Sequence, residues 1–276
     1  MLPLVLGELV NHAKSLWKYP TSNWVACKPE PEELVAAEKE ATTAAQFDRL
    51  GLKRTVWEGY KQGTVKLVCK RLGTLARVLI FLPKGVDEPN WDLWARIFEW
   101  FGRASNKKPW KVTYFAAEKQ REFPEQGQDL GPEHVNGGYT MACSTTGIFI
   151  YRCEEHTRVL IHEMVHAACL DEHKWSIPER EAMVETWAEL ILIALVSKGR
   201  PMIADKLWLN QSHWIADTNW RAKHMNNTHD LTDYAWRYLC GREEMYQRVG
   251  IALPAPRPAH SKRTESLRFT HPSLEV

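Results

Sequence analysis

The sequence lacks three features that would each assign it to a broad class of protein. Its longest uninterrupted apolar run is residues 190–196, whereas a helix needs about 20 apolar residues to cross a bilayer. Its charges nearly cancel, with 36 Lys and Arg against 34 Asp and Glu, so there is no basic excess to attract nucleic acid. Its first residues carry no basic segment, and Glu8 interrupts their apolar run, so they do not resemble a secretory leader. We therefore expect a cytoplasmic protein with no membrane span and no nucleic-acid partner.

The cysteines form neither a metal-binding pattern nor a dense disulfide framework. No CxxC pair occurs, and the 6 cysteines are spread along the chain. Without a secretory leader, nothing places them in an oxidising compartment, where disulfides persist. We expect free, buried thiols at all of these positions, which are Cys27, Cys69, Cys143, Cys153, Cys169 and Cys240.

The composition is that of a soluble globular protein, with 276 residues of which 44% are hydrophobic. A chain of this length can bury a substantial core. Apolar segments at 65–69, 76–82 and 110–116 predict strands, and a hairpin is predicted between 137–141 and 148–151. Residues 91–101 have apolar side chains at helical spacing, which predicts an amphipathic helix covering the sheet.

Changes in composition along the chain suggest three parts. Residues 1–50, punctuated by prolines and rich in Ala and Glu, predict a helical N-terminal extension. Residues 51–251 would form the main domain, with a sheet lobe to about residue 170 and a helical lobe from about residue 177. In the helical lobe, residues 202–208 and 214–225 are predicted to be helical. Residues 252–276 are Pro-rich and basic, so we expect an extended tail that packs poorly unless it binds another surface.

The most informative segment is an H-E-x-x-H pattern at residues 162–166. The flanking residues contain no Gly or Pro, and apolar residues fill the other faces, which predicts a helix. A helix completes a turn in about 3.6 residues, so the imidazoles of His162 and His166 point the same way and can share one metal ion. Glu163 lies at the edge of that face, where its carboxylate can accept a proton from a water at the metal. The pattern also fits a helix with two hydrogen-bonded, partly buried histidines.

A second helix with regularly spaced carboxylates is predicted downstream. Residues 176–179, Ser-Ile-Pro-Glu, form a capping box with Pro in the first turn, which marks the start of a helix. Glu181, Glu185 and Glu189 follow at intervals of four and therefore line one face. Because like charges at this spacing repel each other, we expect a positive group against them. A catalytic zinc site needs a third protein ligand, which this face could supply.

H-E-x-x-H followed, after residues 167–184, by Glu185 resembles the pattern of the gluzincins. These are zinc metallopeptidases that include the thermolysin-like enzymes and the zinc aminopeptidases. The resemblance implies that His162, His166 and Glu185 bind Zn2+ and that Glu163 is the general base. It also implies that Glu189, one turn after Glu185, orients a zinc-bound imidazole. The implied fold is α+β and zincin-like, with a small mixed sheet, an active-site helix and a mostly helical C-terminal lobe.

Residues 135–190 are also similar to uncharacterised proteins of large DNA viruses that are predicted zincin proteases. The likeness lies in the stretch of residues 135–155, which runs into the H-E-x-x-H helix, and in residues 185–189. In the zincin fold, the strand before the active-site helix borders the cleft and pairs with extended substrate. The resemblance makes Gly138, Tyr139 and Thr140 candidates for backbone contacts to a peptide, although an ordinary buried hairpin fits the same residues.

Together these residues predict a zinc-dependent peptidase that acts on a peptide or protein substrate through a zinc-activated water. Gluzincins usually supply a Tyr or His that donates to the oxyanion, and we select Tyr234 for this role. The other candidates for it are Tyr238, His224 and His229. Arg152 and Arg158, near the H-E-x-x-H segment, could hold the C-terminal carboxylate of a substrate.

Two other interpretations stay open, and a third does not fit the residues. A deformylase-type amidohydrolase would take an upstream cysteine, Cys143 or Cys153, as its third ligand. A catalytically inactive zincin-like protein would use zinc only to stabilise a binding fold. The metzincin pattern needs Gly at 169 and His at 172, but this chain has Cys169 and Glu172 there, so the sharp turn lacks its glycine. The oligomeric state is not predicted.

Overall fold

The structure is a computed structural model, and it describes residues 2–43, 46–104, 106–125, 127–171, 174–225, 239–257 and 266–275. The chain divides into two compact units, each assembled from separated segments. We call residues 19–120 and 136–170 the sheet unit, and residues 1–18, 121–135 and 171–276 the helical unit. The mixed α and β content agrees with the predicted fold class.

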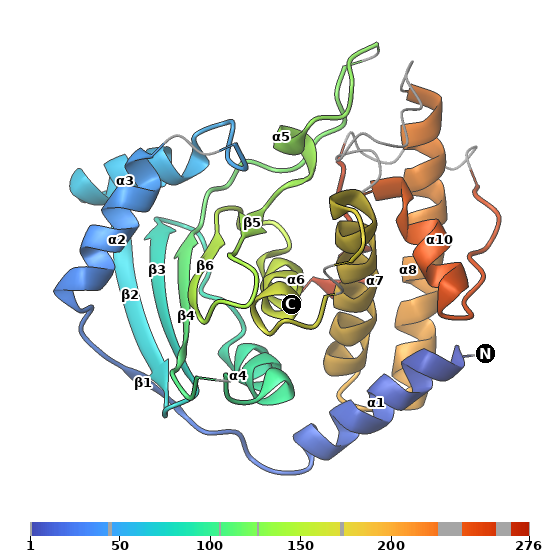
Figure 1. The fold of residues 1–276 in the computed structure, drawn as a ribbon, viewed down its shortest axis with the longest axis horizontal. Coiled ribbons are helices and arrows are strands. Elements are labelled where there is room, and N and C mark those ends of the chain that lie inside the picture. Colours follow the sequence, from blue (N-terminus) through green and yellow to red (C-terminus); the bar gives the residue numbers. More distant parts are fainter. Residues whose placement is uncertain are drawn as a thin grey trace. The chain divides into compact units, whose positions relative to one another are not determined.

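The sheet unit is built on one sheet of six strands in the order β1-β2-β3-β4-β6-β5 (Figure 1). The strands are β1 (Trp24–Ala26), β2 (Val65–Leu72), β3 (Ala76–Pro83), β4 (Trp110–Phe115), β5 (Gly138–Tyr139) and β6 (Thr146–Ile150). β3, β4 and β6 run parallel to one another, whereas β1, β2 and β5 pair antiparallel with their neighbours. The predicted strands and hairpin are therefore present, and β5 lies at one edge of the sheet.

Helices cover both faces of this sheet (Figure 1). They are α2 (Pro31–Thr42), α3 (Leu52–Lys61), α4 (Trp91–Phe101) and α6 (His156–Ala167). Leu79 and Phe81 of β3 pack in one core with α2 and α3. Val78, Ile80 and Leu82, which alternate with them along the strand, are equally buried and point to the other face. On that face, the indole Nε1 of Trp94 in α4 donates to Thr157 Oγ1 in α6 at 3.1 Å. The first turn of α6 is therefore anchored to α4.

The helical unit is organised around α7, which contacts α1, α8 and α10. Its elements are α1 (Leu4–Trp17), α5 (Pro132–Val135), α7 (Ile177–Val196), α8 (Pro201–Met225), α10 (Arg242–Arg248) and the 3-10 turn η2 (Pro272–Leu274). The predicted capping box at the start of α7 is present. Beyond its end, Gly199 adopts φ +68°, and an added Cβ would lie 2.3 Å from Lys14 Cα. Only glycine allows α1 to approach so closely at this point.

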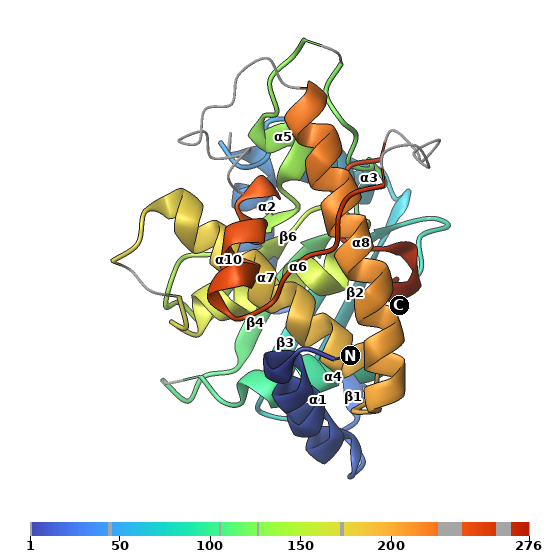
Figure 2. The same ribbon diagram turned by 90° about the vertical axis from the view of Figure 1, so that its right-hand side faces the viewer.

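The longest described helix is α8, with 25 residues. It is one continuous helix (Figure 2) that includes both segments predicted to be helical, 202–208 and 214–225, together with residues 209–213 between them. The intervening Gln211 is buried and bonded through its side-chain amide, which donates to Phe269 O at 2.8 Å and accepts from His271 N at 2.7 Å. In the part of the chain that the structure describes, no helix combines the length and apolar character needed to span a membrane.

The end of the Pro-rich tail packs on the helical unit itself. Leu267, Phe269 and Leu274 are buried, and Leu267 N donates to Arg121 O at 3.0 Å. The tail was expected to pack poorly unless it binds another surface. The helical unit of the same chain provides that surface.

The prediction of free thiols at all cysteines is wrong for two of them. Cys143 and Cys169 form a disulfide, with their Cα atoms 4.7 Å apart. The other cysteines are free, namely Cys27, Cys69, Cys153 and Cys240. The two partners are 26 residues apart in sequence, and they meet only because the loop before β6 folds against the end of α6.

Candidate functional site

The helix α6 carries the H-E-x-x-H segment, and its residues after the first are all buried. It ends in a Schellman motif, in which Cys169 N donates to His166 O and Leu170 N donates to Val165 O, both at 3.1 Å. Cys169 takes the left-handed conformation that this motif requires, with φ 58°. The predicted helix is confirmed, and both of its ends are held by specific contacts.

The two histidines of α6 face each other, as predicted. Their Nε2 atoms are 3.1 Å apart, and their relative exposures are 4% for His162 and 8% for His166. Two imidazole nitrogens on a tetrahedral zinc ion, each about 2.0–2.1 Å from the metal, would be about 3.3 Å apart. Two neutral imidazoles can also share one hydrogen bond at this distance. The pair therefore fits a metal ion, and it fits the imidazole–imidazole hydrogen bond as well.

Glu163 is buried beside the edge strand β5. Its relative exposure is 5%, and a Cβ built on Gly138 would lie 3.3 Å from Glu163 Oε1 and 2.6 Å from Val159 Cγ1. The glycine therefore lets the backbone of β5 approach α6 more closely than any side chain would permit. A carboxylate next to an edge strand lies close to the place where an extended peptide could add to the sheet.

The side chain of Tyr139, next to Gly138, is occupied by contacts within the sheet unit. Its ring stacks on Phe47 with centroids 5.3 Å apart, and its hydroxyl accepts from Lys53 Nζ at 3.0 Å. Lys53 is itself buried and paired with Glu40. Tyr139 is thus anchored to α3, which leaves its backbone as the part suited to a peptide.

The three predicted carboxylates of α7 differ in their surroundings. Glu185 and Glu189 are fully buried, whereas Glu181 is half-buried. Glu189 Oε1 is paired with the guanidinium of Arg242 in α10, and Glu189 Oε2 accepts from the Tyr246 hydroxyl at 2.5 Å. The positive group that we expected along this face is therefore Arg242, for Glu189 at least.

Arg242 and Tyr246 were not predicted from the sequence. The only signal for Arg242 was the expectation of a positive group near the carboxylates of α7. Arg242 Nη2 also donates to Asn219 Oδ1 at 3.4 Å, and its guanidinium lies 4.9 Å from the centroid of the Phe269 ring. Burial raises the pKa of Tyr246 well above its usual value, and the charge of Glu189 raises it further. The tyrosine is therefore a permanent donor to Glu189 at neutral pH.

The candidates for an oxyanion donor fall mostly outside the described residues. Tyr234 lies there, together with Tyr238 and His229. His224 is described and exposed; its ring stacks on Trp220 with centroids 4.0 Å apart, and its Nδ1 lies 2.7 Å from Trp220 O. His224 thus has a local role at the end of α8.

The two arginines near α6, which were candidates for holding the C-terminal carboxylate of a substrate, are buried. Arg152 donates through Nε to Asn136 O at 2.9 Å and through Nη1 to Lys119 O at 2.9 Å. Arg158 is 1% exposed. Arg152 therefore ties loop backbone together inside the sheet unit.

The two cysteines proposed as deformylase-type ligands are poorly suited to bind a metal. Cys143 is consumed by its disulfide. Burial raises the pKa of the Cys153 thiol, and the nearby carboxylates of Glu118 and Glu154 raise it further. Since metals bind the thiolate form, the structure disfavours both as ligands.

Comparisons of the chain with models of protein families, with curated proteins and with solved structures found no match. Its function must therefore be argued from the chemistry and geometry of its own residues.

Proposed function

We propose that the protein is a zinc-dependent peptidase in which His162 and His166 supply two ligands and a carboxylate of α7 supplies the third. The observation that carries the proposal is the pair of buried imidazoles with Nε2 atoms 3.1 Å apart, next in sequence to the buried Glu163. Two neutral imidazoles and one carboxylate leave a divalent zinc with a net charge of about +1, which preserves its Lewis acidity.

Glu185 is our first choice for the third ligand, because its spacing from His166 is that of the gluzincins and its carboxylate is buried. Glu181, one turn earlier on the same face and half-buried, is the competing choice, because its carboxylate is also a possible metal ligand at the helical spacing of four residues. Glu189 is poorly suited, because both of its oxygens are engaged by Arg242 and Tyr246. We propose that Glu189 fixes α7, in place of the imidazole-orienting role that the resemblance implies.

Zinc, when bound, would polarise the scissile carbonyl and lower the pKa of the attacking water to about 7. In this scheme Glu163 takes the proton from that water and passes it to the leaving amine. The outer edge of β5 would pair with the extended backbone of the substrate, and Gly138 would keep that edge close to Glu163.

A non-catalytic protein stabilised by zinc is the competing proposal, and the same histidine pair would serve it. Such a site has no need of a carboxylate at the edge of the sheet, so the position of Glu163 beside Gly138 favours the peptidase. The surroundings of Cys143 and Cys153 argue against the deformylase-type alternative.

Zinc binding by paired variants tests the ligand set. The full chain is stripped with a chelator, and zinc stoichiometry and affinity are measured by competition for the native protein, His162→Ala, Glu185→Ala and Glu181→Ala. We expect one zinc per native chain. His162→Ala and Glu185→Ala should each lower the zinc affinity by more than about 100-fold, since loss of an outer-shell partner alone lowers metal affinity by 10–100-fold.

Glu181→Ala and Glu185→Ala serve as controls for each other, because they remove the same group from the same helix. A large loss in Glu181→Ala with normal binding in Glu185→Ala would move the third ligand to Glu181. A native protein that binds no zinc at equimolar concentration would refute the proposal. If zinc binds, a mixed peptide library analysed by mass spectrometry then tests for cleavage.

A further inference from the structure

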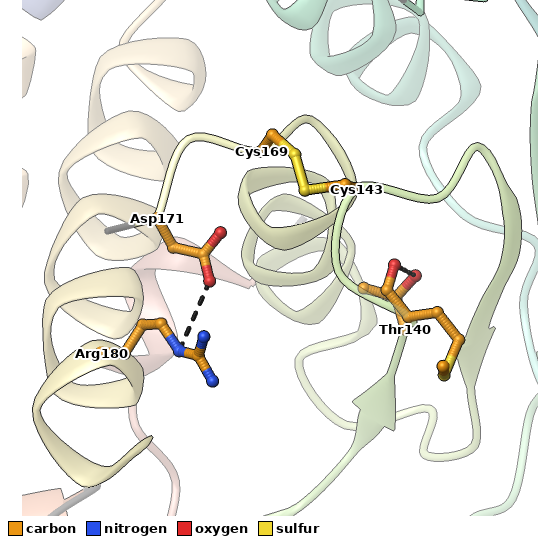
Figure 3. The surroundings of a disulfide bond; sticks show 6 residues. Thr140, Cys143, Cys169, Asp171 and Arg180 are labelled. Carbon is orange, nitrogen blue, oxygen red and sulfur yellow. Dashed lines mark hydrogen bonds and ion pairs between the residues drawn. A yellow bond between two sulfur atoms is a disulfide. The ribbon is translucent and has the colours of Figure 1, made fainter. Parts of the chain in front are cut away.

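The disulfide between Cys143 and Cys169 lies at the end of the helix that carries the histidines (Figure 3). Both of its cysteines are exposed, and so are the apolar neighbours Met141 and Leu170. An exposed disulfide is open to attack by a small thiol, and such bonds are the ones that are readily exchanged.

The backbone of His166 joins the two halves of this disulfide. His166 O accepts one hydrogen bond from Cys143 N at 3.0 Å and another from Cys169 N at 3.1 Å. The disulfide therefore closes a small ring of covalent and hydrogen bonds around the residue that we propose as a zinc ligand. Movement of either cysteine would disturb the end of α6 at His166.

Both cysteines also hold a conformation that non-glycine residues rarely adopt. Cys143 has φ 60° and Cys169 has φ 58°, a region that is unfavourable for an L-residue. The Schellman motif already requires this conformation at Cys169, so the residue that reduction would allow to relax is Cys143. The loop released in this way follows directly on β5, the strand whose edge we propose for substrate.

We propose that Cys143 and Cys169 are a reversible redox site, and that their disulfide positions His166 for zinc. The effect on zinc binding rests on the proposed function, whereas the reversible redox chemistry of the two cysteines does not. The co-reactant is a small thiol of the glutathione class.

The exchange needs two molecules of that thiol. The first thiolate attacks Sγ of one cysteine, which forms a mixed disulfide and releases the other cysteine as a thiolate that takes up a proton. The second thiolate attacks the small-thiol sulfur of the mixed disulfide, so the oxidised small disulfide leaves and the remaining cysteine is released and protonated. The reverse reaction restores the protein disulfide.

A second cysteine pair in the sheet unit provides the internal contrast. Cys27 Sγ and Cys69 Sγ are 3.1 Å apart as free thiols. Cys69 is buried, and burial together with the neighbouring Cys27 raises the pKa of its thiol to about 12. Because the thiolate is the reactive form, this pair should exchange more slowly than Cys143 and Cys169. Cys27→Ser, which leaves the disulfide intact, is therefore a suitable control variant.

The test equilibrates the full, metal-free chain in reduced and oxidised glutathione at a series of ratios. Alkylation and peptide mapping then give the state of each cysteine. Zinc affinity and hydrogen exchange of residues 140–170 are measured for the oxidised chain, the reduced chain and Cys143→Ser/Cys169→Ser. The double variant has neither the disulfide nor a thiol at positions 143 and 169, so it separates loss of the disulfide from zinc binding by the released cysteines.

We expect glutathione to reduce the disulfide reversibly. The double variant should bind zinc about 10-fold or more weakly than the oxidised chain, as when an outer-shell partner is lost. The backbone amides of residues 143 and 169 should exchange hydrogen faster. Cys27→Ser should behave like the native chain in each measurement. Failure of glutathione to reduce the bond, or equal affinity and equal exchange in the oxidised chain and the double variant, would overturn the inference.

If no form binds zinc, the proposed function fails and hydrogen exchange alone decides the inference. Faster exchange confined to residues 140–145 and 164–170 on reduction would uphold the positioning of His166, and unchanged exchange there would refute it.

Discussion

The helices α6 and α7 both bury charged or titratable side chains, but these side chains have different kinds of partner. In α7, Glu189 has a dedicated cation, Arg242, and a dedicated donor, Tyr246, within the helical unit. In α6, His162 and His166 present two nitrogens to each other at 3.1 Å. A buried carboxylate with its own cation is part of the fold, whereas facing imidazoles are suited to a cation from solution. Substitutions at Glu189 should therefore change stability, and substitutions around the histidines should change chemistry.

Glu163→Gln gives the strongest test of the α6 half of this contrast. We expect peptide hydrolysis to fall by about 10²–10⁴-fold, the usual contribution of a general base, because the amide cannot take the proton. Zinc content and thermal stability should stay at the native level, since Gln keeps the size of Glu. Library cleavage at the native rate would remove Glu163 from the mechanism.

Glu189→Ala tests the α7 half. The substitution leaves Arg242 buried without its counter-ion, which costs about 3–5 kcal/mol of the free energy of unfolding. Urea denaturation followed by circular dichroism measures this cost. The control is Glu244→Ala in α10, which removes a solvent-exposed pair with Arg248 and should cost less than about 1 kcal/mol. A Glu189→Ala protein with native stability and weakened zinc binding would instead support the imidazole-orienting role.

Gly138→Ala probes the contact between β5 and α6. The new Cβ would lie 2.6 Å from Val159 Cγ1 and 2.7 Å from Phe149 O, so the strand must move away from Glu163. Overpacking of this kind costs about 1–3 kcal/mol, and we expect a matching loss of unfolding free energy together with a raised KM for peptides. Gly7→Ala, where nothing lies within 4 Å of the new Cβ, should instead be neutral or slightly stabilising. Unchanged stability and KM in Gly138→Ala would show that the close approach is unimportant.

The smallest effect is expected at Glu33, the partner of Arg77 in the sheet unit. Burial raises the pKa of Glu33, but hydrogen bonds from Arg77 and from the backbone outweigh it, and the pKa lies below its usual 4.5. A lowered pKa in the folded state stabilises the protein above about pH 4.5, and this contribution is lost as the pH falls through the folded-state pKa. Glu33→Gln should therefore flatten the acid limb of the stability–pH curve, measured by urea denaturation between pH 3 and 6. An acid limb identical to the native one would exclude this pair as its source.

Local spacing accounts for what could be predicted of the fold. The strands β2, β3 and β4 and the helices α4, α6 and the start of α7 follow from apolar periodicity and a capping box, because these patterns act within one or two turns of chain. Residues 209–213, which no apolar pattern assigned, also belong to α8, and buried Gln211 among them forms two hydrogen bonds with the tail, a contact that no local pattern encodes.

The same division applies to the candidate site. Sequence alone determined that His162 and His166 share a helix face and that Glu189 needs a cation, since four residues make about one helical turn. Only the tertiary structure decided that this cation is Arg242, 53 residues away, that Gly138 lies against Glu163, and that Cys143 is bonded to Cys169. The reason is physical. Helix geometry follows from neighbouring residues, whereas the partner of a buried charge or thiol is whichever distant segment the packing of the whole unit brings to it.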